Sequence, residues 1–277
     1  MRLSCNPLLF FKDIAVDRTM SLNDWFETAA RLGLEGTEVQ HVCLPSLEAD
    51  DLAQMAGAIR ARGLEVSQFI SAPDFVNPDP QFHRQQIRTL QQHIDAAALL
   101  GAHCVRITAG QEYPDVPMQQ GIARIVASFL ECLEYADRKD VCLAYENHYK
   151  DYFWERRDFS ARGEVYLEIL DRLQDTALRV NFDCANPLMV GEDPAPLLGR
   201  VVDRVVHVHC TDRAKLFEYT HSVPGEGKVD FPSVFGILKR AGFDGWLSIE
   251  YNGVEGLEGL KRAIGNVRST WEQTPSP

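Results

Sequence analysis

The sequence predicts an α/β fold, a single (β/α)8 TIM barrel formed by residues 1–271. Three observations support it: eight short apolar or β-branched runs, helical stretches between them, and a length of 277 residues, near the roughly 250 that eight strand–helix units need. Strict alternation implies parallel strands joined by crossover helices. An open doubly wound sheet is the alternative, but no GxGxxG follows the first run and no GxxxxGK[ST] occurs.

The elements are predicted in chain order from apolar runs and from helix start and stop signals. Ser21 and Asp24 form a capping-box pattern at the start of the first helix, and Gly33 ends it. The clearest long helices are expected over 80–100 and 118–138, and residues 272–277 are expected to be a disordered tail. Helix-ending glycines precede three further strands: Gly63, Gly101 and Gly242. The expected strands are 3–5, 36–39, 66–70, 104–108, 141–145, 178–182, 205–208 and 246–249.

Composition and charge narrow the function class. With 45% hydrophobic and 25% charged residues, the chain is an ordinary globular protein able to bury a large core. The formal net charge of −12, without a run of Lys and Arg, would repel a nucleic-acid backbone. A small neutral or metal-chelating substrate therefore suits the chain better than nucleic acid.

Cysteine usage and the N-terminus indicate a cytoplasmic protein without a membrane association. The seven cysteines are scattered without a CxxC pair, so reduced and buried thiols are expected. The apolar patch at residues 8–11 is too short for a signal-peptide core or a membrane span.

Four polar residues end the last four predicted strands: Glu146, Asp183, His209 and Glu250. The C-terminal ends of barrel strands carry the reactive groups of this fold. Three converging carboxylates would repel one another unless a cation lay among them. One divalent ion removes that cost, and this donor set suits Mn²⁺ or Mg²⁺, with Co²⁺ or Zn²⁺ also able to bind. Any one of these acids is as readily a helix cap or a surface ion pair, but all four together favour a metal site.

His207 requires a separate interpretation, because it lies two residues before His209 and so on the same face of the strand. We expect a core histidine, bonded to a ligand carboxylate, rather than a fifth ligand.

Four segments carry a resemblance to a known family: AYENH at 144–148, HCTD at 209–212, VPGEGKVDF at 223–231 and GFDGWLSIE at 242–250. They resemble the xylose isomerase-like barrel superfamily, in particular the sugar phosphate isomerase/epimerase proteins, over nearly the whole chain. The resemblance implies one divalent metal held by Glu146, Asp183, His209 and Glu250. By similarity to tagatose and psicose 3-epimerases, it also makes Glu146 and Glu250 the acid/base pair.

One position departs from the pattern of many relatives, which have a histidine three residues after the metal-binding Asp. Here that position is Asn186. In the deoxyribonuclease IV branch that histidine helps to bind a zinc cluster. Its absence, together with the acidic charge, argues against a DNA-repair nuclease.

These features predict a divalent-metal-dependent isomerase or epimerase of a sugar or related keto-polyol, acting by proton transfer through an enediolate. A lyase that dehydrates a keto acid such as 3-dehydroshikimate is the first alternative, and a non-catalytic sugar- or metal-binding barrel is the second. The aromatic loop at 148–162 fits either a lid or a contact in a homo-oligomer. Arg106 is a substrate-binding candidate or a member of a buried ion pair. The other expected substrate-binding residues are His148, Arg213 and Glu226.

Overall fold

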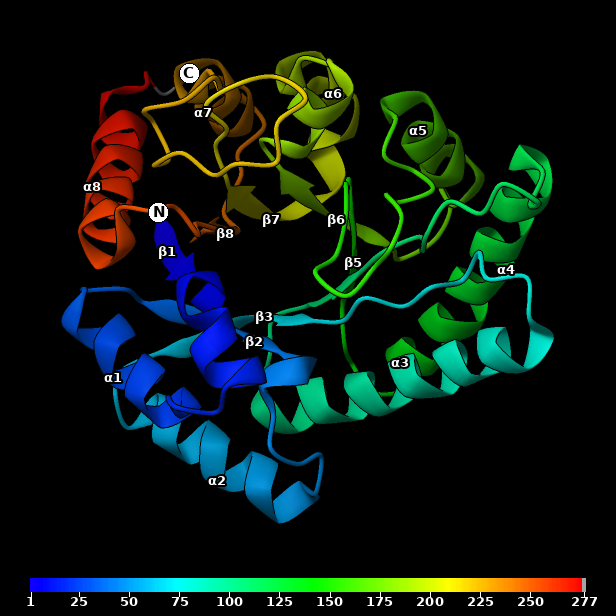
Figure 1. Ribbon diagram of the computed structural model, residues 1–277, viewed down its shortest axis with the longest axis horizontal. Helices are drawn as coiled ribbons and strands as arrows, with labels where there is room; N and C mark the ends of the chain where they lie inside the picture. Colours follow the sequence, from blue (N-terminus) through cyan, green and yellow to red (C-terminus); the bar gives the residue numbers. More distant parts are fainter. Residues whose placement is uncertain (276–277) are drawn as a thin grey trace.

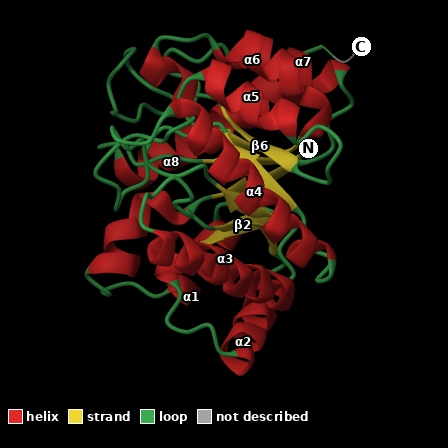
Figure 2. Ribbon diagram, turned by 90° about the vertical axis from the view of Figure 1, so that its right-hand side faces the viewer, coloured by secondary structure: helices red, strands yellow, loops and turns green. Residues whose placement is uncertain are grey.

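The computed structural model describes residues 1–275 and contains one eight-stranded sheet enclosed by helices (Figures 1 and 2). The sheet order is β1-β8-β7-β6-β5-β4-β3-β2, and every hydrogen-bonded pair is parallel. The fold is therefore the predicted (β/α)8 TIM barrel. The strands are β1 Arg2–Cys5, β2 Gly36–Gln40, β3 Glu65–Ile70, β4 Val105–Ile107, β5 Leu143–Glu146, β6 Arg179–Asp183, β7 Val205–Cys210 and β8 Trp246–Ile249.

The barrel closes between β1 and β2 through Glu35, the residue before β2. Its backbone N–H donates to the Leu3 carbonyl at 3.0 Å, and its side chain accepts from the Leu3 N–H at 2.5 Å. Gly36 then begins β2 against the ring of Trp246, where a Cβ would lie 2.7 Å from the nearest ring carbon. Only glycine leaves room for this ring at the closure.

The helices alternate with the strands and surround them in chain order (Figure 1). At the start of α1, Ser21 and Asp24 form the expected capping box, with both reciprocal bonds present. Gly101 ends α3 in the left-handed conformation, at a φ of 70°. No helix within residues 1–275 is long and apolar enough to cross a membrane. The helices are α1 Leu22–Arg31, α2 Ala49–Arg60, α3 Pro80–Leu100, α4 Met118–Asp137, α5 Gly163–Arg172, α6 Pro194–Val201, α7 Phe231–Arg240 and α8 Gly256–Gln273.

The C-terminal helix extends further than the sequence suggests. Residues 272 and 273, assigned above to a disordered tail, are the last two residues of α8. Trp271 packs on Phe235 of α7 with ring centroids 5.3 Å apart, and Lys239 donates to the Thr274 carbonyl at 2.5 Å. These contacts with α7 hold the final turn. Residues 276–277 of the predicted tail lie outside the described residues.

The two faces of the barrel sheet differ in chemistry. The outer face is apolar: Tyr145 of β5, for example, packs against Phe129 of α4 and Tyr166 of α5. The inner face carries fully or nearly fully buried polar residues, where barrels of this type are usually filled by branched apolar ones. They include Ser4, Glu38, Arg106, Asn181 and His207. This polar interior lies directly beneath the mouth of the barrel.

Candidate metal centre

The four strand-end residues meet at one point. Glu146 and Asp183 are the last residues of β5 and β6, His209 is the penultimate residue of β7, and Glu250 directly follows β8. One potential ligand atom from each lies within 4.8 Å of those of the other three. The sheet thus brings together the residues that the strand-end argument selected.

The interatomic distances fit a common cation. His209 Nδ1 lies 2.7 Å from Glu146 Oε1, 3.0 Å from Glu250 Oε2 and 3.9 Å from Asp183 Oδ2. Ligands about 2.1 Å from an octahedral ion are about 3 Å apart when adjacent and about 4.2 Å apart when opposite. Three carboxylates and one imidazole are also a donor set that divalent ions accept. The residues therefore fit a divalent metal ion.

Burial and mutual charge shift the pKa values within the cluster. Burial, with the Glu250 and Glu146 carboxylates, raises the pKa of Asp183 to about 6. Burial opposes ionisation of Glu146, but Arg106 and His209 outweigh it and hold the pKa of Glu146 far below its usual range. Burial also opposes protonation of His209, yet the carboxylates of Glu38, Glu250 and Glu146 raise its pKa well above the ordinary value. The cluster thus has the negative field that attracts a cation.

Asp183 is fixed by a dense set of hydrogen bonds. Its Oδ1 accepts from the backbone N–H groups of Ala185 and Asn186 at 2.8 and 2.6 Å, and its Oδ2 accepts from Thr211 Oγ1 at 2.6 Å. The Asn147 side chain bonds both the N–H and the carbonyl of Asp183. These hydrogen bonds fix the orientation of the carboxylate.

Arg106 forms a buried ion pair, which was one of the two roles that the sequence allowed for it. Its Nε donates to Glu146 Oε2 at 2.5 Å, and its Nη1 donates to the Ser71 carbonyl at 3.2 Å. The other carboxylate oxygen of Glu146 faces His209. One oxygen of Glu146 is thus held by Arg106 and the other points to the cluster.

A cavity of about 510 Å³ opens onto the cluster, and His148 lies in its wall. His148 Nδ1 lies 3.2 Å from Asp158 Oδ2, and both side chains are buried. This pairing leaves Nε2 of His148 for a bound molecule. Other lining residues include Asn6, Gln40, His41, Arg106, Glu146, Lys150, Asp151, Asn186, His209, Tyr219, His221, Glu250 and Asn252.

The predicted lid or contact loop contributes apolar side chains to the same cavity. Tyr152 and Phe153 line it although 65% and 58% of their surfaces remain exposed. Phe11 packs against both rings. The cavity lining therefore combines apolar side chains with the charged residues of the cluster.

Two expected substrate-binding residues, Arg213 and Glu226, do not line the cavity. Arg213 is fully buried and stacks on Tyr219, 4.7 Å from the ring centroid; Tyr219 lines the cavity, whereas Arg213 is not among the lining residues. Glu226 does not reach the cavity, because it pairs at the surface with Arg262 of α8 at 2.9 Å. Its loop is turned away by Asp212, whose carboxylate accepts three of the loop's backbone N–H groups.

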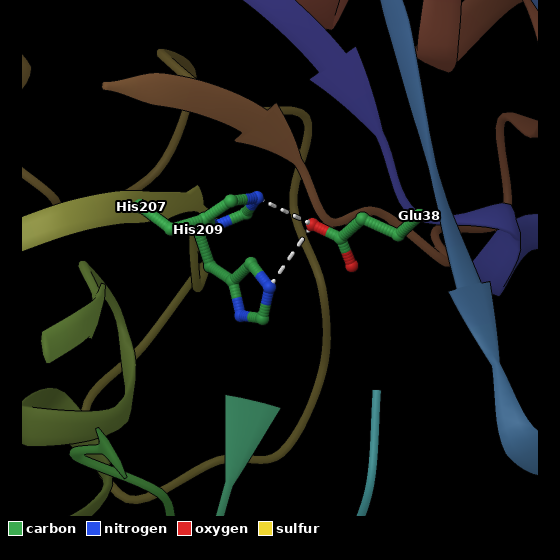
Figure 3. A group of neighbouring side chains, drawn as sticks. All are labelled: Glu38, His207 and His209. Atoms are coloured by element: carbon green, nitrogen blue, oxygen red, sulfur yellow. Dashed lines mark hydrogen bonds and ion pairs between the residues drawn. The ribbon is translucent and has the colours of Figure 1, made fainter. Parts of the chain in front are cut away.

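Sequence reasoning missed residues that support the site from inside the barrel or from a distant loop. Glu38, on β2, contacts His207 and His209 (Figure 3). An acidic residue within a strand-like run was the available signal for it. Asp158 carried no such signal, because its partner His148 lies ten residues earlier in an irregular loop.

The comparison with protein families agrees with this architecture. The model of the family described as xylose isomerase-like TIM barrel matches residues 26–270. The chain belongs to the xylose isomerase-like TIM barrel family.

Curated relatives of this xylose isomerase-like protein have several activities. The rhizopine catabolism protein MocC of Rhizobium meliloti is 38% identical over 102 residues, which are 30% of this chain and 31% of that protein. An inosose dehydratase of Clostridium tetani is 30% identical over 32% of this chain and 36% of its own length. A 2-oxo-tetronate isomerase of Cupriavidus necator is 25% identical over 59% of this chain and 60% of its own length. The matches to the first two relatives span about a third of those proteins.

Solved structures share the fold over the whole chain. D-psicose 3-epimerase of Clostridium cellulolyticum H10, crystallised with D-tagatose, superposes with a TM-score of 0.79 at 13% identity and covers 100% of both chains. IOLI protein with a binding zinc atom has a TM-score of 0.79 at 18% identity, again covering 100% of both chains.

Proposed function

We propose that this protein is a divalent-metal-dependent isomerase or epimerase of a sugar or related keto-polyol. The observation that carries the proposal is the convergence of Glu146, Asp183, His209 and Glu250 beside a cavity of about 510 Å³. These four residues would hold one ion, for which Mn²⁺ or Mg²⁺ is favoured by the oxygen-rich set. The zinc in IOLI protein supports Zn²⁺ as a further candidate. When bound, the ion supplies electrostatic stabilisation of charge that develops on the substrate oxygens.

Glu146 and Glu250 are the proposed acid/base pair. Both line the cavity, and each lies within 3.0 Å of the same His209 nitrogen. In the metal-free protein, Arg106 and His209 lower the pKa of Glu146 and His209 lowers that of Glu250, against the effect of burial. A bound cation would likewise keep both carboxylates ionised, as a base requires. One carboxylate would take a proton from the carbon next to the substrate carbonyl, and the other would return one.

His148 is proposed to bind a substrate hydroxyl. Asp158 holds its Nδ1, and so Nε2 remains to donate to, or accept from, an oxygen in the cavity. Trp154 packs edge-on against the ring with centroids 5.3 Å apart, which further limits its rotation.

A dehydratase is the second candidate, and the pairing of His148 with Asp158 favours it. A histidine oriented by a buried carboxylate is suited to protonate a departing hydroxyl. The inosose dehydratase relative supports this reading. Isomerisation conserves the mass of the substrate, whereas dehydration releases water, so product mass on a panel of keto sugars, inososes and keto acids separates the two.

The decisive experiment combines metal analysis with isotope labelling. We expect about one divalent ion per chain, lost in Asp183→Ala and His209→Ala variants. Glu146→Gln and Glu250→Gln should each lower turnover by about 10²- to 10⁴-fold with the fold intact by circular dichroism.

Product formed in D₂O should gain deuterium at the reacting carbon, because a carboxylate proton exchanges with solvent. An unlabelled product at slow turnover would contradict the acid/base roles. Full metal content in both ligand variants would contradict the metal site.

A further inference from the structure

Glu38 is a charged residue at a place where charge is costly. It lies on β2 inside the barrel, with 0% of its surface exposed. Burying an ionised carboxylate is unfavourable unless hydrogen-bond donors face it. Its hydrogen-bond partner is Nε2 of His209 on β7, at 3.1 Å, and Nε2 of His207 lies 3.3 Å from the same oxygen without forming a hydrogen bond (Figure 3).

The contacts divide the two nitrogens of His209 between two tasks. Nε2 lies 3.1 Å from Glu38 Oε1, whereas Nδ1 faces Glu146, Glu250 and Asp183. A neutral imidazole has one N–H and one lone pair, and an ionised carboxylate only accepts. A cation in the strand-end cluster would take the place of a proton at Nδ1, and Glu38 would then accept the one remaining N–H, at Nε2, which leaves the Nδ1 lone pair for the cation.

We propose that Glu38 is a positioning residue for the metal centre, which fixes the tautomer and orientation of His209 so that Nδ1 is the ligand. The inference rests on the metal centre of the proposed function. Metal-binding histidines generally donate their second ring N–H to a carboxylate or carbonyl, and losing that partner weakens metal binding. Here the partner comes from β2, which is not a neighbour of β7 in the sheet and lies 171 residues away in the chain.

Glu38, His207 and His209 also form a group with the residue types of a metal site. A neutral His209 has one lone pair, so an ion held there would compete with one held by the strand-end cluster. The strand-end cluster has three carboxylates, against one in the inner group, and it opens onto the cavity. We therefore assign Glu38 and His207 to the support of His209 rather than to a second metal site.

His207 and Asn181 contact Glu38 and His209 inside the barrel. Nδ1 of His207 lies 3.0 Å from Asn181 Oδ1, and its Nε2 lies 3.3 Å from Glu38 Oε1. The Asn181 amide nitrogen lies 3.3 Å from Nδ1 of His209. The rings of His207 and His209 are thus both contacted by residues of β2 and β6.

The test measures metal affinity in three variants. Glu38→Leu removes the acceptor, Glu38→Gln keeps an acceptor oxygen without the charge, and Thr37→Val is the matched control. Thr37 is the buried neighbour on β2 whose hydroxyl bonds Trp25, so its loss weakens the same strand without touching His209. Co²⁺ is titrated calorimetrically into each metal-free protein, and urea unfolding reports stability.

We expect Glu38→Leu to weaken Co²⁺ binding by about 10- to 100-fold, Glu38→Gln to weaken it less, and Thr37→Val to leave it unchanged. Equal affinity in the wild type and both Glu38 variants would overturn the positioning role and leave the proposed function standing. An equal loss in Thr37→Val would also overturn it. Absence of Co²⁺ binding by the wild type would overturn both proposals.

A spectroscopic readout on the wild type does not depend on any variant folding. In the Zn²⁺-loaded protein, ¹⁵N shifts of the His209 ring should show a protonated Nε2 and a metal-bound Nδ1. The reverse assignment, with the proton on Nδ1, would overturn the inference.

Discussion

Replacing Arg106 by Met should lower the free energy of unfolding of the metal-free protein by about 3–5 kcal/mol. The guanidinium is within 2.5 Å of Glu146, and the two side chains are 7% and 1% exposed. The substitution leaves a buried carboxylate oxygen without its donor and removes the bond to the Ser71 carbonyl. That cost arises from the unpaired charge and not from the lost contact alone.

The matched control is Arg84→Met. Arg84 contacts Glu131 at 2.9 Å, but the side chains are 55% and 43% exposed, so water replaces the partner and the loss should be about 0–1 kcal/mol. Urea unfolding of both variants in a chelator compares the two. Adding saturating Mn²⁺ should restore part of the loss in the Arg106 variant, because a cation then faces the same carboxylate. Equally small losses in the two variants would refute the assignment of Arg106 to a buried pair.

Two further predictions concern the fold. Gly36→Ala should lower the free energy of unfolding by about 1–3 kcal/mol, because its Cβ would meet the Trp246 ring. The control Gly57→Ala in α2, where a Cβ meets nothing within 4 Å, should be neutral or slightly stabilising. Equal urea midpoints for the two variants would contradict this prediction. Burial and the nearby His41 lower the pKa of His93 to about 3. Between pH 6.5 and about 3 the unfolded chain therefore binds a proton that the folded chain does not. The free energy of unfolding should decrease as the pH is lowered through this range. Urea unfolding at pH 7, 6 and 5 should show a smaller decrease of stability with falling pH in His93→Gln than in the wild type. Identical decreases in the two proteins would count against the prediction.

The sequence alone determined the fold and the strand-end cluster, because both depend on local signals. Strand-like runs recur in all eight units, capping residues and helix-ending glycines mark several of the helices, and each predicted strand overlaps its observed counterpart. In a parallel barrel all strands end at the same mouth. Residues such as Glu146 and Glu250 could therefore be assigned to one site from their positions in the chain, without any knowledge of contacts.

Only the tertiary structure decided how these residues are paired and supported. The sequence left open whether Arg106 pairs or binds substrate, and the structure pairs it with Glu146 in the wall of the cavity. Glu226, expected to bind substrate, pairs with Arg262 outside the barrel. Glu38 reaches His209 only because the sheet closes and the inner faces of β2 and β7 turn towards the same interior. Such contacts join residues from distant strands, so they depend on the closure and register of the whole barrel, which no local pattern of residues specifies.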